Sequence, residues 1–311
     1  MSFLYLLESI RNPVLDFLFS IITLCGEEIA FMAVGMIFFW CIDKYKGYFL
    51  LCVGFLGTAI NQVLKMIFRI PRPWIKDPDF TIVESAREAA TGYSFPSGHT
   101  QTAVGLFGGI ARFTKKKAIL IASIAVAVLV PLSRMYLGVH TPADVLVSTC
   151  IATALIFIVY PLFNKASNSP KVMFSVLVAL TLIMAAYACF IMLYPFPAEV
   201  YAEDVIHNLE SAQETAFTLL GCMLGLTLAY AVDIKWIKFE TDAVWWVQII
   251  KAVGGLLLVV AVKALAKAPL EALLVNALAA RCVRYFLMVV VGGILWPMTF
   301  KYFAKLGRKK A

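Results

Sequence analysis

Long apolar runs recur along most of this sequence, and they constrain the possible fold more than any other feature. A helix needs about 20 mostly apolar residues to cross roughly 30 Å of hydrocarbon, and runs approaching or reaching that length follow one another here. The chain is 62% apolar and only 15% charged, whereas soluble domains are about half apolar and a quarter charged. The sequence therefore predicts an all-α, polytopic transmembrane helix bundle with no sizeable soluble domain.

We expect about nine membrane spans. They are placed near 28–43, 47–68, 99–113, 118–136, 143–163, 171–194, 212–232, 244–266 and 283–303. Several of these runs are short, so eight or ten spans also fit the pattern. The seven cysteines are scattered among the apolar runs without a CxxC pair, which is typical of small core residues and not of a disulfide framework or a metal site.

The chain divides into three parts on this basis. Residues 1–26 hold an apolar run too short to span, which favours an interfacial or re-entrant helix. The residues that interrupt this run are Glu8, Arg11, Pro13 and Asp16. Residues 27–195 form a core of about six spans that carries every chemical motif, and 196–311 form a C-terminal extension of three spans with no recognised motif.

Three short motifs fall at the same ends of neighbouring spans. The first runs from Lys65 to Pro73 (KMIFRIPRP), the second is PSGH at 96–99, and the third is SRMYLGVHTPAD at 133–144. Together they bring the cations Lys65, Arg72 and Arg134, two histidines and one carboxylate to one membrane depth. Because a buried charge is costly in a bilayer, such a gathering of cations calls for an anion. A phosphoryl group fits, since arginine binds its oxygens bidentately and lysine adds a point charge.

Each motif also has a purely structural explanation. Lys65 and Arg72 are able to snorkel at a helix end, and Pro96 with its neighbours is a suitable helix start. Thr141-Pro142-Ala143-Asp144 is likewise a good capping sequence. The chain holds three histidines, however, and two of them lie in these motifs. All the structural explanations would have to hold at once, so the functional interpretation is favoured.

In the functional interpretation a helix start offers free N–H groups and a positive dipole end to a phosphate. Ser97 adds a hydroxyl, Gly98 lets the backbone approach closely, and Arg134 reaches the same anion. His140 and Asp144 stand four residues apart, close enough to pair. A carboxylate that accepts one ring N–H fixes the tautomer and leaves the other nitrogen nucleophilic. His99 then remains as the general acid.

The pattern K-x6-RP, PSGH and SR-x5-H-x3-D resembles the type 2 phosphatidic acid phosphatase superfamily, which also includes glucose-6-phosphatases and vanadium haloperoxidases. The matching positions are Lys65, Arg72, Pro73, Pro96, Ser97, Gly98, His99, Ser133, Arg134, His140 and Asp144. The resemblance covers roughly residues 28–165. It implies a helical bundle whose site lies near the outer membrane surface. It also implies His140 as nucleophile, His99 as acid and base, and Asp144 as the group that orients His140. The phosphoryl clamp would be Lys65, Arg72, Ser97, Gly98 and Arg134. The last three spans depart from the six that are usual in bacterial members.

Charge asymmetry predicts the orientation. The face opposite the motifs carries Lys44, Lys46, Arg112, Lys115, Lys116, Lys117, Lys165, Lys171, Lys235, Lys238, Lys301, Lys305, Arg308, Lys309 and Lys310. Four acidic residues share that face, while the other acidic residues lie on the motif face. Because cytoplasmic loops collect Lys and Arg, the motif face is predicted to be non-cytoplasmic. The same rule accounts for the net charge of +8 without a nucleic-acid partner.

We therefore expect a multi-pass protein of the cell membrane that takes part in phospholipid metabolism as a hydrolase. It would hydrolyse lipid phosphate monoesters or diphosphates through a phosphohistidine, with no metal and no other cofactor. Two alternatives stay open: a phosphatase of soluble sugar phosphates, similar to glucose-6-phosphatases, and a lipid transporter or binding protein with an inactive site. A haloperoxidase is disfavoured by the membrane-embedded chain. The sequence leaves open which lipid is used and whether the chain forms a homo-oligomer.

Overall fold

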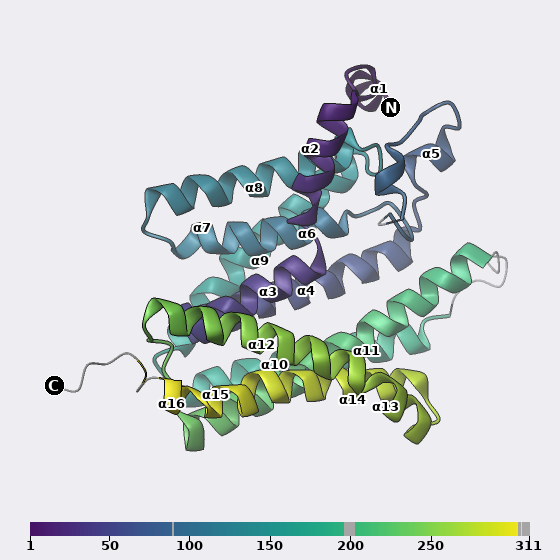
Figure 1. The fold of residues 1–311 in the computed structure, drawn as a ribbon. Helices are drawn as coiled ribbons and strands as arrows, with labels where there is room; N and C mark the ends of the chain where they lie inside the picture. Colours follow the sequence, from purple (N-terminus) through teal and green to yellow (C-terminus); the bar gives the residue numbers. More distant parts are fainter. Residues whose placement is uncertain (89, 196–202, 304–305, 307–311) are drawn as a thin grey trace. The chain divides into compact units, whose positions relative to one another are not determined.

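The computed structural model describes residues 1–88, 90–195, 203–303 and 306, and within them it contains helices and no strand (Figure 1). The chain splits into two compact units. Unit 1 comprises Met1–Met32, Leu50–Tyr160 and Phe196–Glu210, and unit 2 comprises Ala33–Phe49, Pro161–Pro195 and Ser211–Ala311. All the predicted site residues belong to unit 1. The predicted three-part division remains a prediction.

Unit 1 is built from short helices at the amino terminus followed by long apolar ones. They are α1 (Ser2–Ser9), α2 (Pro13–Leu24), α4 (Lys44–Phe68), α5 (Pro73–Lys76), the 3-10 turn η2 (Glu84–Ala86), α6 (Gly98–Ala103), the π-helical turn η3 (Val104–Gly108), α7 (Gly109–Phe113), α8 (Lys117–Tyr136) and α9 (Pro142–Ala166). Helix α8 contacts α2, α6, η3 and α7, so it is the central element of this unit. Helices α3 (Glu28–Ile37), α4, α9 and α11 (Glu203–Val232) each have residues in both units.

Unit 2 is a second set of apolar helices. They are the π-helical turn η1 (Phe38–Ile42), α10 (Pro170–Leu193), α11 (Glu203–Val232), the π-helical turn η5 (Asp233–Ile237), α12 (Trp245–Leu265), α13 (Lys267–Leu273), α14 (Ala277–Val290), the π-helical turn η6 (Val291–Leu295), α15 (Trp296–Met298) and α16 (Phe300–Phe303). The buried Lys251 of α12 donates to the carbonyl of Thr241 at 2.8 Å and lies 4.3 Å from the ring centroid of Phe300. Local contacts therefore account for this intramembrane cation.

The described residues form seven helical segments long and apolar enough to cross a membrane, or up to eight if a bent pair counts as one span. The bent pair is α2 (Pro13–Leu24) followed by Glu28–Ile42, with 49° between its halves. This count is close to the predicted nine. The difference lies at 99–113, where α6, η3 and α7 together are shorter than the segments that qualify. The protein is thus a multi-span membrane protein.

The amino-terminal segment is two helices where the sequence predicted one. Pro13 disfavours a helical conformation at Asn12, and the Asn12 side chain accepts from the backbone N–H groups of Val14 and Leu15, so α2 begins anew there. The interfacial or re-entrant placement of the segment remains a prediction.

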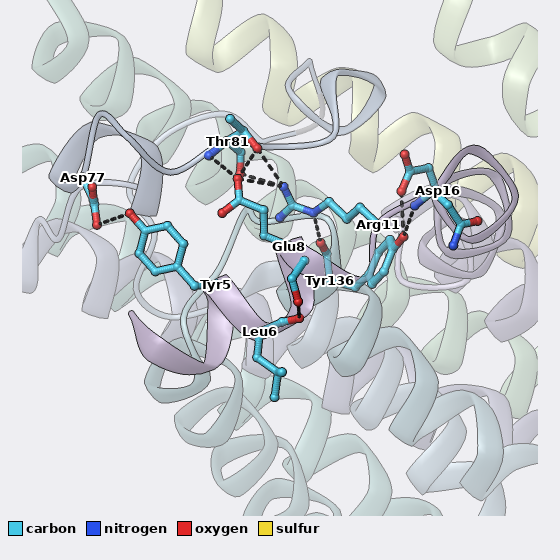
Figure 2. A network of polar contacts seen from close by, with 10 residues as sticks. Tyr5, Leu6, Glu8, Arg11, Asp16, Asp77, Thr81 and Tyr136 are labelled. Atoms are coloured by element: carbon cyan, nitrogen blue, oxygen red, sulfur yellow. Dashed lines mark hydrogen bonds and ion pairs between the residues drawn. The ribbon is translucent and has the colours of Figure 1, made fainter.

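Polar contacts join these helices to the loops around the motifs (Figure 2). Arg11 donates to the carbonyls of Tyr136 and Thr81 at 3.0 and 2.9 Å, and Glu8 accepts from Thr81. Tyr136 in turn donates to Asp16 at 2.7 Å. The amino-terminal helices therefore hold the loop that contains Thr81 and the carboxyl-terminal end of α8, which belongs to the third motif.

Candidate active site

Helix α8 ends in a way that fixes where His140 begins. Gly138 has φ +83°, its N–H donates to Met135, and the N–H of Val139 donates to the carbonyl of Arg134, both at 3.1 Å. These two bonds form a Schellman motif, which places a glycine in the left-handed conformation just past a helix end. The chain turns sharply at Gly138, so His140 follows immediately after the last turn of α8.

Helix α9 then begins with a capping box. Thr141 Oγ1 accepts from the N–H of Asp144 at 3.3 Å, and Asp144 Oδ2 accepts from the N–H of Thr141 at 2.7 Å. The reciprocal bonds satisfy two donors at the helix start. The structural explanation of this segment therefore holds, and the same carboxylate is also brought toward His140.

The imidazole of His140 lies between a carboxylate and a guanidinium. Its Nδ1 is 3.5 Å from Asp144 Oδ2, and its Nε2 is 2.9 Å from Nη1 of Arg72. The Nδ1 contact has the distance of an ion pair but not the geometry of a hydrogen bond. Because arginine only donates, Nε2 must be the acceptor, which assigns the ring proton to Nδ1 on the Asp144 side. The lone pair of Nε2 accepts this bond from Arg72, and it becomes free to react once that bond is given up.

Ser94 was missed by the sequence analysis. This fully buried residue donates from Oγ to Asp144 Oδ2 at 2.6 Å, so Oδ2 accepts from both Ser94 and Thr141. The two bonds fix the carboxylate that faces His140. The only signal in the sequence was the position of Ser94 two residues before the second motif.

Arg72 is held by backbone carbonyls. Its Nε, Nη1 and Nη2 donate to the carbonyls of Gly92, Val139 and Thr91 at 2.9, 2.9 and 2.6 Å. Its side chain is buried, and one further Nη1 hydrogen points to His140. These bonds tie the loop that precedes the second motif to the turn that carries His140. The guanidinium is therefore a fixed part of the site.

Two other predicted phosphate ligands, Lys65 and Ser97, lie near Asp144. The Lys65 ammonium lies within electrostatic reach of Arg72, Arg134 and Asp144. Ser97 caps α6 by accepting from the N–H of Thr100 at 3.4 Å, and its own N–H donates to the carbonyl of Asp144 at 3.3 Å.

Open space lies beside the start of α6. A Cβ added at Gly98 would meet nothing within 4 Å. Nε2 of His99 is buried and has no hydrogen-bond partner among the described residues. His99 also lies within electrostatic reach of His140. The three motifs thus assemble around one site, with the second histidine available to an incoming group.

Arg134 has a partner that the sequence analysis did not identify. Its Nη1 donates to Thr23 Oγ1 at 2.9 Å, and both side chains are buried. Its Nε and Nη2 are buried without a hydrogen-bond partner among the described residues. No motif or spacing marked Thr23, because it lies inside an apolar run of the amino-terminal segment.

The electrostatic environment keeps His140 neutral. Burial lowers the pKa of its imidazole well below the ordinary value, and the positive charges of Arg72, Arg134 and Lys65 lower it further. A neutral imidazole retains the lone pair that a nucleophile requires.

Groups of three or more His, Cys, Asp or Glu side chains suited to a metal ion are not found in the described part of the chain. The cations of the site would instead hold an anion. Metal-independent chemistry remains a prediction.

Buried cations beside a histidine that faces a carboxylate, in a multi-span helical membrane protein, define a membrane protein with a cluster suited to an anion. Comparison with known proteins makes the assignment specific. The family model described as "PAP2 superfamily" matches residues 45–168. A second model, described as "PAP2 superfamily phosphatase, transmembrane extension", matches residues 217–309. Phosphatidylglycerophosphatase B of Bacillus subtilis is 32% identical over 169 residues, which cover 48% of this chain and 76% of that protein. The chain belongs to the PAP2 superfamily.

Other relatives are similar to this chain over parts of their length. Human sphingosine-1-phosphate phosphatase 2 is 26% identical over 232 residues, which cover 72% of this chain and 54% of that protein. The chain thus spans about half the length of this relative. Among solved structures, the first transmembrane PAP2 type phosphatidylglycerolphosphate phosphatase from Bacillus subtilis is 30% identical, with a TM-score of 0.44. The match covers 53% of this chain and 84% of that one.

Proposed function

We propose that this protein is a membrane phosphatase that hydrolyses lipid phosphate monoesters or diphosphates through a phosphohistidine. The observation that carries the proposal is the position of the His140 ring, whose Nε2 faces Arg72 at 2.9 Å while its Nδ1 faces Asp144 at 3.5 Å. A neutral imidazole with a fixed tautomer, next to a fixed cation, is suited to attack a phosphorus atom held by that cation.

In the first step, Nε2 of His140 attacks phosphorus and forms an N–P bond while the P–O bond to the lipid breaks. The leaving oxygen takes a proton from His99. The ring becomes positively charged, and the Asp144 carboxylate stabilises that charge across the Nδ1 side. Ser94 and Thr141 keep the carboxylate in place, as their 2.6 and 2.7 Å bonds indicate.

In the second step, His99 takes a proton from water, the resulting hydroxide attacks phosphorus, and the N–P bond breaks to release inorganic phosphate. The phosphoryl oxygens are held throughout by Lys65, Arg72 and Arg134, with the Ser97 hydroxyl and the Gly98 N–H at the start of α6. A fixed set of donors aimed at the charge that develops in the transition state is often the largest contribution to catalysis.

The proposed substrate is an amphiphile whose phosphate lies at the membrane edge. Relatives are named as phosphatases of sphingosine 1-phosphate, phosphatidylglycerophosphate and undecaprenyl diphosphate, so a lipid anchor is common among them. The lysine-rich opposite face supports a non-cytoplasmic site in the cell membrane. This orientation can be tested in intact cells, by labelling single cysteines that are introduced into the 77–83 loop of the protein.

The test of the function is phosphate release by the purified protein from micellar lipid phosphates, with EDTA present and with a soluble sugar phosphate in parallel. We expect turnover of a lipid phosphate in the chelator, and none by His140→Ala. Quenching with a denaturant at alkaline pH should trap an acid-labile, base-stable phosphoprotein in the wild type only. Preference for the sugar phosphate would overturn the lipid assignment, and wild-type turnover by His140→Ala would overturn the mechanism.

A further inference from the structure

The guanidinium of Arg134 is held at one corner only. Thr23 Oγ1 accepts from Nη1 at 2.9 Å, whereas Nε and Nη2 are buried and have no partner among the described residues. Nε–H and Nη2 share one edge of the planar guanidinium and donate in parallel, which is the geometry that binds two oxygens of one phosphate. The unpartnered edge is therefore the one suited to an anion, and the bond to Thr23 turns that edge away from Thr23.

Thr23 lies in the last turn of α2, next to the tightly packed elbow, residues 25–27, that joins α2 to α3. A Cβ added at Gly26 would lie 2.9 Å from the carbonyl oxygen of His99 and 2.8 Å from Val130, so the elbow packs against both α6 and α8. The Glu27 carboxylate of the same elbow is within electrostatic reach of Arg134. The elbow thus meets the helices that carry His99 and Arg134, although it lies outside the matched family region of 45–168.

We infer that Thr23 is a positioning residue that orients Arg134 so that its Nε/Nη2 edge grips the phosphoryl group. The inference rests on the proposed function and extends it to the amino-terminal segment, which completes the anion site. Thr23 does not touch the phosphoryl group. Thr23 acts through Arg134. It therefore affects the binding of every phosphate ligand, including the product, inorganic phosphate.

The test measures kcat and KM for a lipid phosphate, together with the inhibition constant of inorganic phosphate, in four single variants and one double variant. Thr23→Val removes the hydroxyl at nearly constant volume and should raise KM and the inhibition constant on the order of tenfold, the usual effect of losing a hydrogen bond to a charged group. Thr23→Ser should restore both to within about twofold of wild type. Thr149→Val is the matched control, because among the described residues that hydroxyl bonds only to the carbonyl of Val145 of its own helix, at 2.8 Å.

A double-mutant cycle separates positioning from folding. Thr23→Val should add less than about twofold in an Arg134→Lys background, since the edge it orients is then gone. An unchanged inhibition constant in Thr23→Val, or an equal loss with and without Arg134, would overturn the inference while leaving the phosphatase intact. If the wild type releases no phosphate from any lipid, the proposed function and this inference fall together.

Discussion

Ser94 donates a 2.6 Å hydrogen bond to the same Asp144 oxygen that faces His140, from a loop fifty residues earlier in the chain. Both residues are buried, so the bond is shielded from water. The carboxylate keeps its position because Ser94 and the N–H of Thr141 both donate to Oδ2. The orientation of the proposed nucleophile therefore depends on a residue outside the three motifs.

Ser94→Ala should lower kcat roughly tenfold, because losing a donor to a buried carboxylate costs about 1.5 kcal/mol. The measurement is steady-state phosphate release with a lipid phosphate. Ser148→Ala is the matched control: this serine is equally buried, but its hydroxyl donates at 2.9 Å to the backbone carbonyl of Asp144. Equal effects of the two substitutions would show that the carboxylate bond has no special role.

Arg72→Lys should lower both stability and activity despite keeping the charge. Lysine cannot donate to the three carbonyls that Arg72 serves, and leaving them unsatisfied costs about 2–4 kcal/mol. We expect a lower unfolding temperature in detergent and a loss of turnover of at least roughly a hundredfold. Arg87→Lys, whose partner Glu84 is exposed, should change neither, and a matching loss there would contradict the argument.

Replacement of His99 by Gln should distinguish substrates by their leaving groups. A phenolic leaving group needs no proton, whereas an alkoxide does, so the loss of kcat should be greater for alkyl phosphates than for p-nitrophenyl phosphate. The measurement compares the two esters in the same preparation. Equal losses would argue against a role for His99 as general acid.

His140 should stay neutral well below pH 6.5, since burial and the neighbouring cations lower its pKa. NMR of ring-labelled histidine is practical because the chain contains three histidines. The His140 signal, assigned by its absence in His140→Gln, should keep the neutral shift as pH falls through 6.5. The unfolded chain takes up a proton in that window and the folded chain does not, so stability should also fall with decreasing pH. A midpoint near 6.5 would refute this prediction.

Gly138→Ala should destabilise the turn before His140. The residue has φ +83°, where a side chain costs about 1–2 kcal/mol, and a Cβ would lie 2.7 Å from Nη2 of Arg11 and 3.1 Å from the carbonyl oxygen of Thr81. Thermal unfolding and turnover should both decrease. Gly98→Ala provides the comparison for stability, because its Cβ would meet nothing within 4 Å. An unfolding temperature of Gly138→Ala equal to that of Gly98→Ala would show that the turn does not require glycine at position 138.

Short-range patterns predicted much of the fold. Seven of the nine predicted spans correspond to helical segments able to cross a membrane, and 28–43 forms part of the bent pair. Residues 99–113 were predicted as a span because their apolar run is nearly long enough. The helical stretch does run from Gly98 to Phe113, with a π-helical turn inside it, but it is shorter than the segments that qualify. The break at Asn12 was missed, although proline and an asparagine cap mark it.

The sequence by itself determined which side chains meet, because motifs at successive helix ends are expected at one depth and His140 and Asp144 are four residues apart. Tertiary structure alone decided how they are held. Thr23 is 111 residues from Arg134, and Ser94 is 50 from Asp144. Hydroxyl side chains look alike in a sequence, since capping and periodicity act over about four residues. Only helix packing selects the hydroxyl that reaches a buried charge.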